Sequence, residues 1–304
     1  MSALRKCAWR AVAAMLATVL VASLPGLAGA AAAAPPSKLV DIRAAHHPGF
    51  DRIVFEFRGA PPDIARARWA TTLRMDPSHK LAHVQGSAFI RVRFFPALAH
   101  DLAPPQDSTF GPARRAYALP NIAHVVLLGD YEAEVIVGIG LMKRTRILRA
   151  VTLRKPSRFV VDVVTDFKKG NARVYFIDWR AFIDGTPQYV VPVSRKVPRG
   201  ARAEGAMQRL YAGPTQAEID ADLRFFASQT KGFRDLWINA RSIARVTLRG
   251  PCDSGGSAST TIATHIMPTL RSRPAIDWVK IYDKTGHTLW PWGRSDSLPG
   301  CLQP

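Results

Sequence analysis

The first half of the chain alternates between apolar and polar residues over short stretches. From Asp51 to Phe57, the residues Ile53, Phe55 and Phe57 fall on one side of an extended chain. A period of two predicts a half-buried β-strand. The same pattern, interrupted by Gly, Pro and Asp clusters, predicts further strands at 88–95, 122–128, 134–139, 146–153 and 158–164. Short strands, punctuated turns and no long helix predict an all-β sandwich over residues 38–167.

The periodicity changes beyond a polar hinge at residues 166–171. Residues 203–211 place their apolar side chains at helical spacing, and Gly213 with Pro214 ends that predicted helix. Thr215 and Glu218 form a predicted capping box that opens a second helix carrying Ile219 and Leu223. Further elements are a helix at 258–270 and strands at 173–177, 189–193, 236–238, 243–248 and 278–282. We therefore predict an α+β domain over residues 172–304.

The N-terminal residues have the layout of a secretory signal. Three basic residues precede an uncharged run at 11–24, and Ala28-Gly29-Ala30 supplies the small residues of a cleavage site. We predict a signal peptide over residues 1–30, cleaved near Ala30, and a disordered leader at 31–37. No cysteine follows the run, so we predict no lipid attachment site. The alternative is an uncleaved anchor, for which the run is short against the roughly 20 residues of a membrane span.

Cysteine usage is consistent with export. The chain that remains after the signal holds two cysteines, Cys252 and Cys301. An even number suits disulfide pairing in an oxidising compartment. A bridge between them would close a loop of about 50 residues and stabilise the fold by roughly 4 kcal/mol in the chain-entropy model. Two free thiols are the alternative.

The chain is strongly basic. Its 304 residues carry a net charge of +19, and removing the three positive charges of the signal would leave +16. Such a field attracts anionic partners. For an exported protein these are wall polymers, lipid headgroups or acidic proteins, whereas nucleic acid is not expected. A solvated basic surface without a specific partner is the alternative.

Two segments of the first half resemble a known family. They are HPGFDRIVFEF at 47–57 and KPSRFVVD at 155–162. Both are similar to the AMIN-like domain of actinobacterial exported proteins. The resemblance implies targeting to the envelope and its peptidoglycan.

The second half resembles the GerMN domain, which is named for sporulation and spore-germination proteins. The segments that carry this resemblance are VYFID at 174–178, VPVSRKVP at 191–198, LYAGPTQAE at 210–218, GGS at 255–257 and VKIYD at 279–283. The resemblance implies an envelope protein tied to wall assembly, sporulation or germination, without enzymatic activity.

Two fragments are typical of the serine enzymes that crosslink peptidoglycan. Residues 228–231 match S-x-x-K, and residues 284–286 match K-T-G. We interpret both as accidental. Ser228 follows two phenylalanines near a predicted helix end instead of opening a helix, and the K-T-G fragment falls in a predicted turn. The two also lie too close together in the sequence for that large fold.

Polar clusters offer weaker candidates. His79 and His83 have the spacing of two metal ligands on a helix, but Pro77 and Gly86 favour a loop with solvated histidines. Asp130, Glu132 and Glu134 alternate and would line one face of a strand. Such a face could bind a cation or serve a hydrolase, although a solvated acidic strand face is favoured.

Two tryptophans near the C-terminus are the remaining candidate. Trp290 and Trp292 flank a proline close to the predicted disulfide, and their rings could stack on sugars or plug a domain edge. We predict a non-enzymatic exported envelope protein without cofactor or metal. Its expected partner is an anionic cell-wall polymer, peptidoglycan or an envelope protein, with membrane-surface association a further alternative. An envelope enzyme acting on glycan or peptide through residues 130–134, and a small-ligand-binding protein, are the alternatives.

Overall fold

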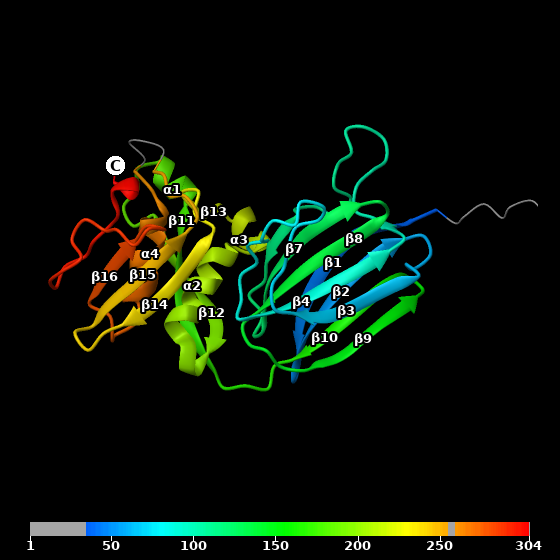
Figure 1. Ribbon diagram of the computed structural model, residues 1–304, viewed down its shortest axis with the longest axis horizontal. Coiled ribbons are helices and arrows are strands. Elements are labelled where there is room, and N and C mark those ends of the chain that lie inside the picture. Colours follow the sequence, from blue (N-terminus) through cyan, green and yellow to red (C-terminus); the bar gives the residue numbers. More distant parts are fainter. Residues whose placement is uncertain (1–34, 255–258, 304) are drawn as a thin grey trace, which may run out of the picture. The chain divides into compact units, whose positions relative to one another are not determined.

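Two five-stranded sheets make up the first half of the chain in the computed structural model, which describes residues 35–254 and 259–303 (Figure 1). Their strand orders are β5-β1-β2-β10-β9 and β3-β4-β8-β7-β6. The strands are β1 Ser37–His47, β2 Phe50–Arg58, β3 Ile64–Ala70, β4 Ala88–Phe95, β5 Ala97–Leu98, β6 Arg114–Ala116, β7 Ile122–Tyr131, β8 Glu134–Leu141, β9 Ile147–Arg154 and β10 Ser157–Val164. Both sheets contribute to one hydrophobic core, which makes them a sandwich.

The period of two explains this core. Ile53 and Phe55 of β2 are fully buried, as are the alternate residues Ile90, Val92 and Phe94 of β4. The Phe94 ring lies 5.1 Å from the Phe55 ring and 5.5 Å from that of Phe159 in β10. Aromatic contacts between the two sheets therefore fix how their inner faces pack. The β-rich first half is confirmed, although β1, β3 and the short strands β5 and β6 were not predicted.

The second half contains two three-stranded sheets and two longer helices. The sheet orders are β12-β11-β13 and β14-β15-β16. The elements are β11 Lys169–Asp178, α1 Trp179–Ile183, β12 Val190–Pro198, η1 Arg199–Ala201, α2 Arg202–Ala212, α3 Gln216–Asp220, β13 Leu223–Arg224, β14 Gly232–Ile238, β15 Ile243–Arg249, α4 Ile262–Arg271, β16 Trp278–Tyr282 and η2 Gly300–Leu302. Side chains from both sheets and from α2 and α4 share one core.

Several boundaries differ from the prediction. The capping box at Thr215 and Glu218 forms, but α3 ends at Asp220, because Asp222 takes a positive φ of 63° and turns the chain into β13. Leu223 is therefore in a strand. Helix α4 begins at Ile262, where the Thr261 side chain accepts a hydrogen bond from the Ala263 amide. A threonine cap, not the apolar spacing, sets that start.

Other predictions fall partly or wholly outside the described residues. These are the signal peptide at 1–30, most of the leader at 31–37, the GGS segment at 255–257 and the start of the helix predicted at 258. The hinge predicted at 166–171 is shorter than expected, because β11 already begins at Lys169.

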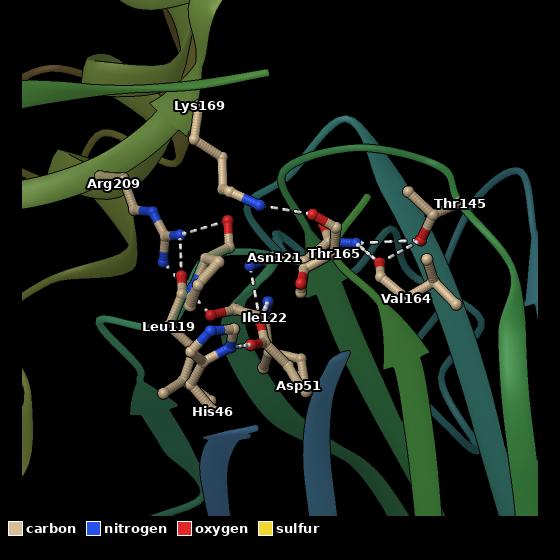
Figure 2. A network of polar contacts seen from close by, with 11 residues as sticks. His46, Asp51, Leu119, Asn121, Ile122, Thr145, Val164, Thr165, Lys169 and Arg209 are labelled. Carbon is tan, nitrogen blue, oxygen red and sulfur yellow. Dashed lines mark hydrogen bonds and ion pairs between the residues drawn. The ribbon is translucent and has the colours of Figure 1, made fainter. Parts of the chain in front are cut away.

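A buried arginine on α2 joins the two halves (Figure 2). Arg209 is 1% exposed, and its guanidinium donates to the carbonyls of Tyr117 at 2.6 Å, Ile122 at 3.2 Å and Leu119. Burial lowers the pKa of Arg209 to about 9. The same segment, residues 117–122, is also bound by the buried Asp51 carboxylate, which accepts from the Ile122 amide at 2.9 Å. These contacts cross the predicted boundary, and Pro35–Pro304 form one compact unit. The division into two domains stays a prediction.

Candidate ligand-binding surface

The outer face of the β14-β15-β16 sheet carries aromatic and basic side chains. Strand β15 buries Ala244, Val246 and Leu248 in the core, so the residue between them, Arg245, lies on the opposite face. The strand register places Trp237 beside Arg245, and Arg245 beside Lys280 of β16. Three neighbouring strands thus place one tryptophan and two cations side by side on the outer face of the sheet.

Three tryptophans are exposed on this part of the molecule. Trp237 is 51% exposed, Trp290 is 68% exposed and Trp292 is 83% exposed. The guanidinium carbon of Arg245 lies 4.9 Å from the centre of the Trp237 ring. The same guanidinium donates to the Pro291 carbonyl at 3.4 Å, so it connects Trp237 to the segment that holds the other two. We call Trp237, Trp290 and Trp292 the tryptophan face.

Buried polar groups hold the backbone beneath these rings. Lys280 is fully buried, and its ammonium donates to the carbonyls of Trp290 at 2.5 Å and Trp292 at 3.2 Å. Desolvation, together with the positive charge of Arg245, lowers the pKa of Lys280. The Trp290 amide in turn donates to the Ser297 hydroxyl at 2.7 Å. The backbone is therefore fixed, while the rings remain open to solvent.

Arg245 retains an unused donor in this surface. Its Nε donates to the Tyr282 hydroxyl at 3.2 Å, and its Nη1 is buried without a hydrogen-bond partner among the described residues. That donor is buried, so the exposed rings are what this face offers a ligand, and flat apolar rings suit the apolar face of a sugar.

A disulfide lies close in the sequence to this segment. Cys252 and Cys301 are bonded, with their Cα atoms 5.7 Å apart and a separation of 49 positions in sequence. Both pack against the core of the second half, and the Cys301 carbonyl accepts from the Ser254 amide at 2.9 Å. The bridge anchors the chain that follows Trp292.

The two enzyme-like fragments take structural positions. Ser228 lies in a turn, not near a helix end as predicted, because α3 has already ended at Asp220. Its hydroxyl accepts a hydrogen bond from the Ile262 amide at 2.9 Å at the start of α4. The K-T-G fragment follows β16 in a turn, as predicted, where Asp283 accepts from the amide and the hydroxyl of Thr285.

The predicted histidine pair lies in the long loop between β3 and β4. Neither His79 nor His83 is in a helix, so the i, i+4 spacing does not place them on one helix face. Burial and the nearby cations Lys231, Arg114 and Arg249 lower the pKa of His83. Within residues 35–254 and 259–303, no group of three or more His, Cys, Asp or Glu is placed to hold a metal ion.

The predicted acidic strand face does not form. Glu132 and Ala133 have φ values of 49° and 58° and make the tight turn between β7 and β8. Asp130 accepts from the Ala99 amide at 3.0 Å and contacts the His100 ring at 2.5 Å. Glu134 instead pairs with Arg93 at 2.6 Å. The hairpin therefore sends these carboxylates to different partners.

A cavity of about 780 Å³ lies beside β1 and β6. Apolar side chains such as Ile42, Tyr117 and Phe225 line it, with Arg43 and Arg115 among its polar groups. Its size is in the range of small-molecule sites. It is the feature that would serve the small-ligand alternative.

Residues 37–165 match the family model of the AMIN-like domain. The match confirms the resemblance of the first half. AMIN-like domains are associated with the binding of peptidoglycan or other envelope components, which makes this a protein with an envelope-type domain. No curated protein and no solved structure matches the chain. None of the described helices has the length and apolar character needed to cross a membrane.

Sequence reasoning found two members of the tryptophan face and missed the rest. Trp290 and Trp292 stand out as a pair in the sequence, whereas nothing in the sequence around Trp237 distinguishes an exposed tryptophan from a buried one. Arg245 and Lys280 each interrupt an apolar alternation. That interruption is the signal that could have indicated an outer sheet face.

Proposed function

We propose that this chain is a non-enzymatic, exported envelope protein that binds the glycan strands of the cell wall through the tryptophan face. The observation that carries the proposal is the exposure of Trp290 and Trp292 above a backbone held by the buried Lys280. Leaving large rings in water is unfavourable. A sugar ring stacked on each of them would remove that cost.

Two further features support the proposed location of the protein. The AMIN-like match at residues 37–165 supports a place in the envelope. The signal layout of residues 1–30 supports export, with cleavage near Ala30. The GerMN resemblance of the second half supports a role in wall assembly or in sporulation- and germination-type processes, where an envelope protein is the alternative partner.

The absence of enzymatic activity is part of the proposal. Ser228 is engaged at the start of α4, and Asp130 and Glu134 are engaged with other side chains. A hydrolytic pair needs two carboxylates on opposite sides of one scissile bond. The hairpin between β7 and β8 gives these two residues different surroundings instead.

Retention on purified sacculi tests glycan binding directly. The sacculi are first stripped of their anionic polymers, so that only peptidoglycan remains. We expect the wild-type chain to be retained in 0.5 M salt and a Trp290→Ala, Trp292→Ala double variant to be retained at least tenfold less. Tyr131→Ala is the matched control, because Tyr131 is 54% exposed at the β7–β8 turn, away from this sheet in the sequence.

Three results would decide against glycan binding. The first is equal retention of the wild-type chain and the tryptophan variant. The second is an equal loss in the Tyr131 control. The third is failure of the wild-type chain to bind stripped sacculi, which would favour a protein partner. Circular dichroism of each variant checks that the fold is intact.

A further inference from the structure

Four arginines form a square on the outer face of the sandwich. Arg66 of β3 lies directly opposite Arg93 of β4, and Arg68 lies opposite Arg91. Residues two apart share a face, so all four side chains lie on one side of the sheet. The pairs are about 5 Å apart across the strands and about 7 Å apart along them. We call these four residues the arginine grid.

The grid has little compensating negative charge. Glu134 lies 2.6 Å from Arg93 and 3.7 Å from Arg91. Arg66 and Arg68 are exposed and have no side-chain ion pair or hydrogen bond within the described part of the chain. The grid lines a cavity of about 330 Å³. Three uncompensated positive charges therefore surround one shallow hollow.

Protection of a sheet edge explains only half of this arrangement. Strand β3 is the edge of its sheet, and charged residues on an edge prevent pairing with other chains. Strand β4 lies inside the sheet, where no such protection is needed. Like charges placed directly opposite each other destabilise a sheet. Opposing two arginine pairs thus costs stability, and a bound anion would offset that cost.

We propose that the arginine grid binds a phosphodiester polymer of the envelope, with one phosphate between each cross-strand pair of arginines. Guanidinium groups bind phosphate and carboxylate oxygens through paired N–H donors. The charged oxygens of a phosphodiester diverge from a tetrahedral phosphorus within the polymer chain, so arginines from two strands can each take one. A carboxylate can also contact two guanidiniums, as Glu134 does with Arg91 and Arg93, but its lone pairs all lie in one plane, whereas those of the two phosphate oxygens do not. Two successive pairs suit charges that repeat along the ligand.

Binding of a labelled poly(glycerol phosphate) oligomer to the whole chain, followed by fluorescence anisotropy in 0.05 M salt, tests this site. We expect an Arg66→Gln, Arg68→Gln double variant to bind at least tenfold more weakly. The matched control is Arg173→Gln with Arg180→Gln, which removes the same charge from two exposed arginines of β11 and α1. The control should lose less than twofold.

A charge-preserving variant separates geometry from charge. Arg66→Lys with Arg68→Lys keeps both positive charges but loses the guanidinium forks, so we expect a loss of about threefold. Full affinity in this variant would overturn the role of the forks. The two glutamine variants should melt within a few degrees of the wild-type chain.

The remaining outcomes each bear on the proposal. Equal loss in the grid variant and its control, or no binding by the wild-type chain, would overturn the site. A polygalacturonate oligomer of equal charge should bind at least fivefold more weakly, and equal or tighter binding would replace phosphate by carboxylate as the ligand group. The site lies apart from the tryptophan face, so its failure leaves retention on stripped sacculi unaffected.

Discussion

The arginine grid and the tryptophan face present their cations in opposite ways. In the grid, the guanidinium groups reach solvent, and the side chains of Arg66 and Arg68 have no ion pair or hydrogen bond to residues 35–254 or 259–303. In the tryptophan face, Lys280 is fully buried under the backbone and Arg245 is half-buried beside Trp237, while the rings are exposed. Both surfaces are outer faces of sheets in a basic chain.

For the two proposed sites, net charge alone does not describe the binding. Exposed cations attract anions over a distance that salt shortens, from about 30 Å at 0.01 M to about 10 Å at 0.1 M. Exposed rings act only at contact and respond little to salt. The two proposed sites together would combine a long-range attraction to anionic polymers with a short-range binding of glycan by ring contacts.

The largest effect that separates the two surfaces should come from the disulfide. Replacing Cys252 and Cys301 with alanine should lower the free energy of unfolding by roughly 4 kcal/mol, because the bridge closes a 49-residue separation. It should also weaken retention on stripped sacculi, since the bridge anchors the chain after Trp292. Urea unfolding and sacculus retention measure the two effects.

The same variant should leave the arginine grid unchanged. Binding of poly(glycerol phosphate) should change less than twofold, because the grid belongs to the first half. If the variant lost both binding activities while it was still folded, the separation of the two surfaces would be contradicted.

Lowering the pH should destabilise both halves of the chain to a similar extent. Burial lowers the pKa of His124 to about 3 and that of His265 to about 4. The unfolded chain therefore binds more protons below pH 6.5, and stability is lost as the pH falls from there toward these folded values. Each histidine should lower the free energy of unfolding by about 2 kcal/mol as the pH falls from 7 to 5.

An isosteric variant assigns this pH effect. His124 accepts from the Gln85 amide through Nδ1 at 3.2 Å, and the side-chain oxygen of His124→Asn can take the same bond. Urea unfolding of this variant at pH 7 and pH 5 should show about half the wild-type difference. An undiminished difference would show that His124 does not contribute.

The smallest effect should be the stability change on removing the exposed rings. Trp290→Ala with Trp292→Ala should change the free energy of unfolding by no more than about 0.5 kcal/mol, because surface substitutions rarely do more. Thermal unfolding measures it. A loss of about 3 kcal/mol would instead identify the rings as part of a core.

Local patterns predicted much of the fold and only part of the sites. Alternation located β2 and β4, and capping chemistry located α3. Strand β3 was missed, because its sequence IARARWA at 64–70 holds few large apolar residues. The arginine grid depends on the register between β3 and β4, which no short pattern encodes. Arg245 similarly acquires its role through contacts with Trp237 and Pro291, distant in sequence from each other.

The most direct test of the account compares retention of the wild-type chain on intact and stripped sacculi as salt rises from 0.01 to 0.5 M. On intact sacculi, retention should begin high and fall, as the polymer-dependent part is screened, to the level seen on stripped sacculi. On stripped sacculi, it should change less than twofold. Loss of retention on both materials with rising salt would contradict the account, since charge alone would then explain all binding.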